Sequence, residues 1–169
     1  MRKAFVRLKG LGFIFWHARH AFYHVLLGLV WAWFLREQWA EFNPKWIWTA
    51  VIGSLIPDID HFFYFFGYGK QDDYTQQIAK MLRGREWRAV TVFIEAGHKQ
   101  NTSLSSHNLW IMGLFLLSSL FASLIEWQAG VILFGAILIH YLFDMADDIV
   151  TLGRINPNWK RWGKPKLRR

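Results

Sequence analysis

Four apolar stretches dominate the sequence, and each is close to the roughly 20 residues that a helix needs to cross a bilayer. They cover about residues 18–35, 46–66, 104–127 and 129–152. Hydrophobic residues make up 53% of the 169-residue chain and aromatic residues 18%, a composition that favours a membrane protein. The sequence therefore predicts an all-α integral membrane four-helix bundle. Residues 1–153 would form a single transmembrane domain and residues 154–169 a basic cytoplasmic tail.

The second stretch contains Pro57, which lacks a backbone N–H and clashes with the preceding turn of a helix. We therefore expect this span to be kinked at Pro57, or to break there and restart with Pro57 in its first turn.

The Lys and Arg residues gather on one side of this predicted topology. Eighteen of the 20 lie in the N-terminal segment, in the loop 67–103 or in the C-terminal tail, and only Arg36 and Lys45 lie elsewhere. Because basic loops stay in the cytoplasm, we predict a multi-pass protein of the inner membrane with both termini and this loop cytoplasmic.

The same rule explains the net charge of +8, so no nucleic acid partner is expected. Anionic lipid headgroups are expected near the basic segments.

The loop 67–103 carries apolar residues at helical spacing, namely Trp87, Val90, Phe93 and Ile94. This pattern predicts a cytoplasmic amphipathic helix between spans two and three. The helix would lie in the headgroup layer or pack on the rest of its own protein, and the sequence favours neither alternative.

Several ionisable side chains fall inside the predicted spans, all in the halves nearest the cytoplasm. They are His24, Asp58, Asp60, His61, His107, His140 and Asp144. At about 1.5 Å of rise per residue they share one layer. An unpaired ionisable group in a membrane is costly and is a candidate functional site. A lone histidine in a membrane helix most often bonds to a neighbouring helix, but the joint pattern from four spans favours a metal site.

The spacing of these residues supports that interpretation. His140 and Asp144 are four residues apart and share one helix face. Asp58 and His61 are three residues apart, whereas Asp60 points elsewhere and would bind a second ion or orient a ligand. The chain has no cysteine, so any metal would have imidazole and carboxylate ligands, which suit zinc, manganese or iron.

Other polar residues near this layer are assigned differently. His20 has the same four-residue spacing to His24, but His17 and His20 are expected at the membrane interface. The role of His98 is left open. Asp147 and Asp148 are expected to face the cytoplasm, with Asp147 within reach of the site.

Four motifs together resemble the membrane-bound metal-dependent hydrolase family, also described as LexA-binding and inner-membrane-associated. They are H24-V-L-L-G28, G53-S-L-I-P-D-I-D-H61, S106-H107 and H140-Y-L-F-D144. The second is the most specific, and the resemblance extends over about residues 20–150. It implies an all-helical membrane protein with hydrolytic activity. One departure is that the family's H-R-G-x-T-H-S string before span three is replaced here by H98-K-Q-N-T-S-L-S-S-H107, without the Arg-Gly pair.

The order of these residues is also similar to that in zinc-dependent phospholipase C, an all-α enzyme with a cluster of metals. This likeness implies a divalent transition metal, zinc in the first place, and allows more than one ion. It implies that His140 and Asp144 share a metal and that the cluster is completed by His24, Asp58, Asp60, His61 and His107.

The leading hypothesis is hydrolysis of a phosphoester, in a lipid, by metal-activated water. Asp58 and Asp60 are the candidate catalytic groups that would take a proton from this water. The main alternative is a non-catalytic membrane subunit whose metal site or polar cluster is structural and which packs against membrane protein partners. Transport of metal ions or protons is less favoured, because the outer halves of the spans carry no polar path.

Overall fold

The described part of the chain is built from helices. The structure is a computed structural model that describes the backbone of residues 11–161 and the side chains of residues 18–161, and within them there is no strand. In chain order the elements are α2 (Leu11–Trp39), α3 (Lys45–Leu55), α4 (Ile59–Phe63), the π-helical turn η1 (Tyr64–Tyr68), α5 (Asp73–Arg83), α6 (Trp87–Asn101), α7 (Leu109–Leu124), α8 (Gln128–Leu152) and the 3-10 turn η2 (Pro157–Lys160). The all-α prediction is confirmed.

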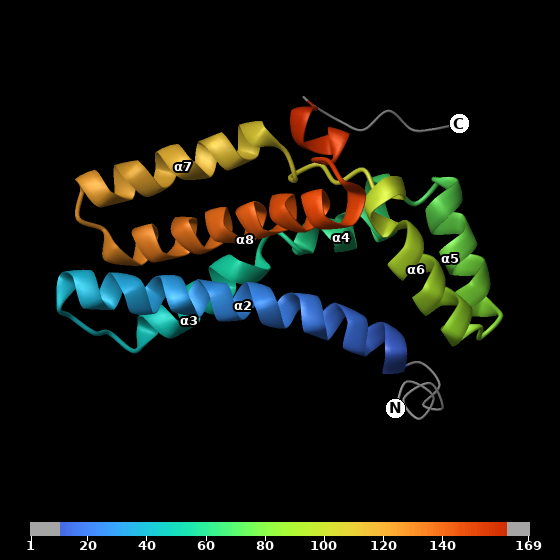
Figure 1. Cartoon of the computed structure of the whole chain (residues 1–169), viewed down its shortest axis with the longest axis horizontal. Helices are drawn as coiled ribbons and strands as arrows, with labels where there is room; N and C mark the ends of the chain where they lie inside the picture. The colour runs from blue at the N-terminus through green and yellow to red at the C-terminus, as the bar shows by residue number, and fades with distance from the viewer. Residues whose placement is uncertain (1–10, 162–169) are drawn as a thin grey trace.

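Helix α8 is the centre of a bundle and contacts α2, α3 and α7, which run alongside it (Figure 1). Its core-facing residues, such as Ile132, Ala136 and Ile137, are buried among these neighbours. The outward faces of α2 and α7 instead carry exposed apolar side chains, among them Phe22, Leu26, Val30, Leu114, Leu117 and Phe121. Apolar surface of this extent marks a face that contacts lipid or another protein.

Only part of the predicted membrane topology is visible in the helices. By length and composition, α8 is the one helix among the described residues that could cross a membrane. Helix α7 is apolar but has 16 residues, because the chain before it is not helical. Helix α2 has the length, at 29 residues, but its three histidines and three charged residues lower its apolar character. The number of spans and their orientation stay predictions.

The second predicted span is broken at Pro57, as expected. Helix α3 ends at Leu55, and the amides of Asp58 and Ile59 bond to the carbonyl oxygens three residues earlier at 3.2 and 3.1 Å. Helix α4 and the turn η1 then continue the chain. The turn η1 ends at Tyr68, whose hydroxyl donates a hydrogen bond back to Oδ1 of Asp60 at 2.8 Å.

The helix predicted between spans two and three from Trp87, Val90, Phe93 and Ile94 is present as α6, and the same loop contains a second helix, α5, that was not predicted. Gly84 ends α5, and Arg85 turns the chain with a positive φ of 58°. Helices α5 and α6 pack against each other through a small core of Tyr74, Ile78, Val90 and Ile94. This contact covers much of the apolar face of α6 and agrees with the alternative in which the helix packs on its own protein.

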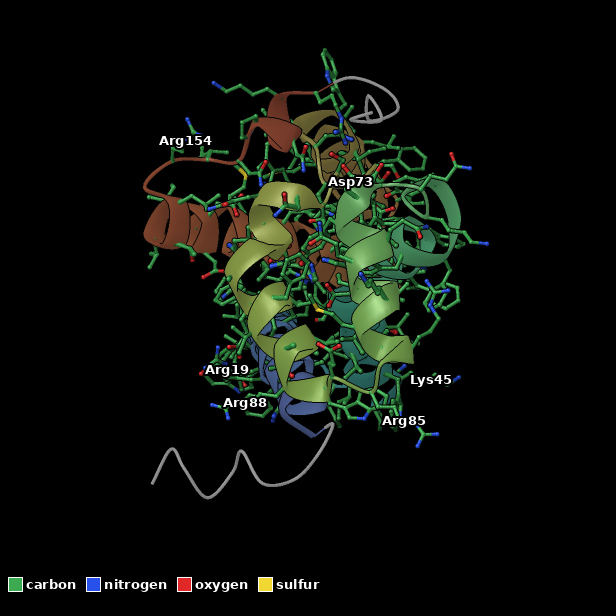
Figure 2. All side chains as sticks on the ribbon, turned by 90° about the vertical axis from the view of Figure 1, so that its right-hand side faces the viewer. Arg19, Lys45, Asp73, Arg85, Arg88 and Arg154 are labelled. Atoms are coloured by element: carbon green, nitrogen blue, oxygen red, sulfur yellow. The ribbon has the colours of Figure 1, made fainter. Side chains whose placement is uncertain are left out.

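The α5–α6 hairpin lies across one end of the bundle, where α6 contacts α2 (Figures 1 and 2). Figure 2 views the molecule from this end, and the side chains of Arg19, Arg85, Arg88 and Arg154 project outward around it. Three of the predicted cytoplasmic segments therefore contribute positive charge to the same end of the molecule.

Two glycines of the sequence motifs lie where helices approach closely. A Cβ atom on Gly28 of α2 would lie 1.9 Å from the hydroxyl oxygen of Ser54 on α3. A Cβ atom on Gly53 of α3 would lie 2.7 Å from the carbonyl oxygen of Leu133 on α8. Only glycine fits these positions, and the close approach sets the spacing of α2, α3 and α8.

We expect Gly53→Ala to destabilise the protein by about 1–3 kcal/mol, because the methyl group would push α3 away from the backbone of α8. Gly113→Ala on α7 is the matched control, since a Cβ there meets no atom within 4 Å. Thermal unfolding in detergent measures both variants. Equal melting temperatures for the two would show that the α3–α8 contact is loose.

Candidate metal centre

His140 is buried on α8, and a hydrogen bond to α3 decides which of its ring nitrogen atoms faces the cluster. Its Nδ1 lies 2.7 Å from the carbonyl oxygen of Ser54. A carbonyl oxygen can only accept, so Nδ1 carries the proton and the Nε2 of the neutral ring carries a lone pair. This Nε2 lies 3.2 Å from Oδ2 of Asp144, one helical turn along α8. A backbone carbonyl that orients the far side of a ring in this way is typical of metal-binding histidines.

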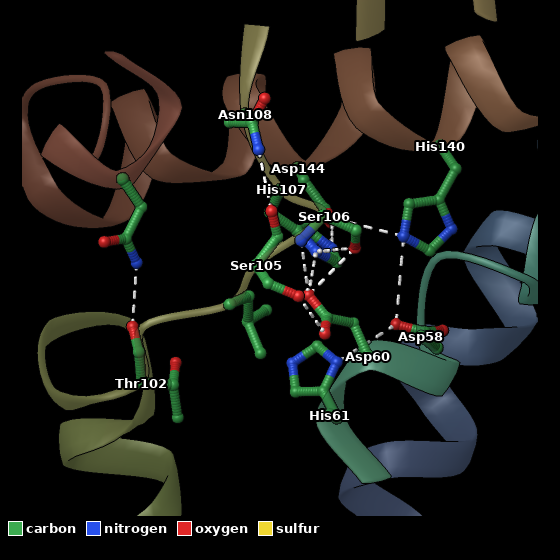
Figure 3. A network of polar contacts seen from close by, with 12 residues as sticks. Asp58, Asp60, His61, Thr102, Ser105, Ser106, His107, Asn108, His140 and Asp144 are labelled. Carbon is green, nitrogen blue, oxygen red and sulfur yellow. Dashed lines mark hydrogen bonds and ion pairs between the residues drawn. The ribbon is translucent and has the colours of Figure 1, made fainter. Parts of the chain in front are cut away.

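His107 is oriented in a similar way by the loop before α7 (Figure 3). Its Nδ1 lies 3.3 Å from Oγ of Ser106, and that hydroxyl donates to Oδ2 of Asp60 at 2.9 Å. The hydroxyl oxygen is thus able to accept a hydrogen bond from Nδ1–H of His107. The Nε2 of His107 then faces Oδ2 of Asp144 at 3.3 Å.

Helix α2 contributes a second pair of histidines on one face. The Nε2 atoms of His20 and His24 each lie 3.3 Å from Oδ1 of Asp144. The rings of His24 and His140 stack with their centroids 3.5 Å apart. His20 was expected at the membrane interface, but the structure places it in the cluster, because its spacing of four residues puts it on the same face as His24. The side chain of His17 lies outside the described residues.

Asp144 is therefore surrounded by four imidazole nitrogen atoms, two on each carboxylate oxygen. The cluster is enclosed, since His24 and His140 are fully buried and the side chain of Asp144 is 15% exposed. Among the described side chains, the buried nitrogen atoms without a hydrogen-bond partner include both of His24, Nε2 of His107 and Nε2 of His140. Buried polar atoms are rarely left unpaired, and lone pairs that face one carboxylate are arranged to bind a cation.

Asp58 is the second carboxylate at this cluster. Its Oδ1 lies 3.8 Å from Nε2 of His140 and 3.7 Å from Nδ1 of His61. The side chain of Asp58 is 29% exposed, so it forms the more accessible edge of the site. The ring of His61 lies 5.6 Å from that of His107 and 5.9 Å from that of His98, between the cluster and α6.

Asp60 differs from the other carboxylates because both its oxygen atoms accept hydrogen bonds. Oδ1 accepts from the hydroxyls of Tyr68 and Ser105 at 2.8 and 2.9 Å, and Oδ2 accepts from the amide and hydroxyl of Ser106 at 2.7 and 2.9 Å. Burial raises the pKa of the Tyr68 phenol to about 12, so it stays protonated and donates. These contacts favour the interpretation that Asp60 orients His107 through Ser106.

Three groups of side chains place their ligand atoms within 4.8 Å of one another. They are His20–His24–Asp144, His24–Asp58–His140 and His107–His140–Asp144. Imidazole and carboxylate donors in such groups could hold a metal ion, and they suit zinc. Five predicted ligands are members of these groups, namely His24, Asp58, His107, His140 and Asp144. The remaining two, Asp60 and His61, lie next to the groups, and their assignment as ligands stays a prediction.

Two cavities adjoin the cluster. A small one of about 50 Å³ is lined by His20, His61, His98, His107 and Asp144. A larger one of about 410 Å³ lies between α2, α6 and α8 and shares His20, His98 and Lys99 with the first. Burial, and then the charge of His61, lower the pKa of His98 to about 3, so His98 contributes a neutral ring to both cavities.

The end of α8 carries a further polar network that the sequence did not predict. Lys99 of α6 bonds to Asp147 at 2.6 Å and to Asp148 at 2.9 Å. Asp148 is buried and also accepts from the indole of Trp159 at 2.8 Å. Asp148 therefore does not face the cytoplasm as expected, and the described part of the tail up to residue 161 packs on the protein.

Fold and site together define a helical protein with a buried His/Asp cluster that could hold metal. A family model described as the YdjM inner membrane protein matches residues 20–151, from the first to beyond the last residue of this cluster. The chain belongs to this family, which confirms the resemblance to the membrane-bound metal-dependent hydrolases. Searches of curated proteins and of solved structures give no significant match.

We expect Asp60→Asn to weaken zinc binding about 10- to 100-fold without changing the number of ions bound at saturation, because it loosens His107 rather than removing a ligand. Competition with a chelator measures the affinity, and elemental analysis of the saturated protein measures the number. If the saturated variant binds fewer zinc ions than the wild type, Asp60 is itself a ligand.

Proposed function

We propose that this protein is a membrane-embedded metal-dependent hydrolase that acts on a phosphoester of a lipid. The observation that carries the proposal is the set of unpartnered imidazole nitrogen atoms around Asp144. Membership of an inner membrane family and the exposed apolar faces of α2 and α7 support a membrane setting.

The chemistry of such a site is metal-assisted hydrolysis. A bound zinc ion lowers the pKa of its water to about 7 and polarises a phosphoryl oxygen. We assign His24, His107, His140 and Asp144 to holding metal. Asp58 is the best candidate for the group that receives a proton from water, because it is the most accessible carboxylate of the cluster and its Oδ1 contacts both His140 and His61. Asp60, with both oxygen atoms occupied by hydrogen bonds, is better suited to orienting His107.

The larger cavity supports a lipid as the substrate. Its lining includes the charged side chain of Arg19, the ring of His98 and the aromatic side chains of Tyr23 and Phe143. Tyr23 and Phe22 are exposed on α2 beside it. A phosphorylated headgroup would lie between Arg19 and the cluster, with the acyl chains along α2. The charge distribution supports a multi-pass arrangement with the hairpin, the site and both termini on the cytoplasmic side.

The second candidate function is a non-catalytic membrane subunit in which the metal holds the helices together. The cavity directly at the cluster favours it, since about 50 Å³ has room for water but not for a whole headgroup. The replacement of the Arg-Gly pair before His107 points in the same direction. This subunit would bind metal without turning over any phosphoester and would pack against membrane partners.

We expect the purified protein to release phosphate or a phosphorylated headgroup from anionic lipids in mixed micelles, and chelation of its metal to abolish this activity. Asp58→Asn should lower kcat at least 100-fold if Asp58 receives the proton, because a carboxamide cannot act as a base. Asp73→Asn, an exposed carboxylate at the start of α5, is the control. Bound metal with no turnover over a broad panel of lipids would support the subunit instead.

Filling the larger cavity tests the lipid route separately. We expect Ala96→Trp to lower kcat/KM for bilayer lipids at least tenfold and to leave the metal content unchanged, because the indole would occupy the cavity between α2 and α6. Val92→Trp, one turn earlier on α6 and exposed, is the matched control. Equal activity of both variants would show that the lipid approaches from another side.

A further inference from the structure

The two oxygen atoms of Asp144 have separate sets of neighbours. Oδ1 lies 3.3 Å from the Nε2 atoms of His20 and His24, both on α2. Oδ2 lies 3.3 Å from Nε2 of His107 and 3.2 Å from Nε2 of His140. The carboxylate therefore has two faces, one at each oxygen atom, and each face has one pair of imidazole nitrogen atoms.

These distances match the distance between two ligand atoms that bind the same metal ion. With Zn–N and Zn–O bonds of about 2.0–2.1 Å and tetrahedral angles, two ligand atoms on one zinc ion are about 3.3 Å apart. A direct N–H···O hydrogen bond would be shorter, most often about 2.9 Å. On each face the ligand atoms are spaced to share a cation.

One ion cannot use both faces. The groups of ligand atoms within 4.8 Å of one another join His20 to His24 and His107 to His140, and among the described residues no such group contains both His20 and His107. The third group, His24–Asp58–His140, links the two faces and brings a second carboxylate between them.

We propose that Asp144 bridges two divalent metal ions, one held with His20 and His24 and the other with His107 and His140. The proposal rests on the metal-dependent function above and adds His20 as a ligand and two as the number of ions. Two divalent cations outweigh the charges of Asp58 and Asp144. The centre therefore keeps a net positive charge, which suits a phosphoester anion and the paired-ion form of hydrolysis.

Zinc counting by elemental analysis and native mass spectrometry tests this proposal on the detergent-purified full chain. The chain is first saturated with zinc and then washed with a weak chelator. We expect two zinc ions per chain in the wild type, and one in His20→Ala and in His107→Ala, because each substitution removes a ligand from one face only. Asp144→Asn should lose both. His98→Ala, which alters the adjoining cavity but no ligand group, should keep two.

The outcomes separate this proposal from the proposed function. A single zinc ion in both the wild type and His20→Ala overturns the bridge and leaves a metal-dependent hydrolase with one ion. No zinc in the wild type overturns both. His20 is 31% exposed, so His20→Ala is expected to fold. Melting temperatures of the apo forms check this, and a loss of zinc in a variant that melts with the wild type supports the assignment of His20.

Discussion

The carboxylate of Asp144 is the group on which the rest of this structure depends. One anionic side chain, largely removed from solvent, contacts four imidazole rings that come from α2, α8 and the loop before α7. Neutral rings with lone pairs toward a carboxylate repel it, and cations that lie between them would turn this repulsion into attraction. Each neighbouring element then serves to aim a ring. The Ser54 carbonyl oxygen fixes His140, Ser106 and Asp60 fix His107, and the helical repeat of α2 aligns His20 with His24.

The closeness of the helices explains why these rings can meet at all. Gly28 and Gly53 remove the side chains that would hold α2, α3 and α8 apart. The Ser54 carbonyl oxygen is consequently within hydrogen-bonding distance of a ring on α8, and His24 stacks on His140. Gly28 and Gly53 have no functional side chain, but they allow the imidazole rings of His24 and His140 to meet. The break at Pro57 then turns the chain so that Asp58 lies at the accessible edge of the cluster.

Local patterns in the sequence were enough to predict much of this site. The spacing of His140 and Asp144, and the common depth of His24 and His107, depend only on helix geometry and charge distribution. His20 was missed because it follows Arg19 at the basic end of α2, although its spacing to His24 was a signal. The role of Asp60 depends on Ser105 and Ser106, which are about 45 residues away in the chain. Contacts of that range leave no local pattern, and the same holds for the pairing of Lys99 with Asp148, 49 residues apart.

The network around Lys99 joins the α5–α6 hairpin to the end of α8. The bundle helices meet backbone to side chain at the glycine positions and have little room to slide. The α5–α6 hairpin is held differently, through Lys99 to two carboxylates at the end of α8 and through the carbonyl oxygen of Lys99, which accepts from Asn156. Because the side chains of Lys99 and Asp148 are largely buried, salt screens this ion pair much less than it screens a surface pair. The pair of Lys99 and Asp148 therefore ties the hairpin to the end of α8 even where the ionic strength at a membrane surface is high.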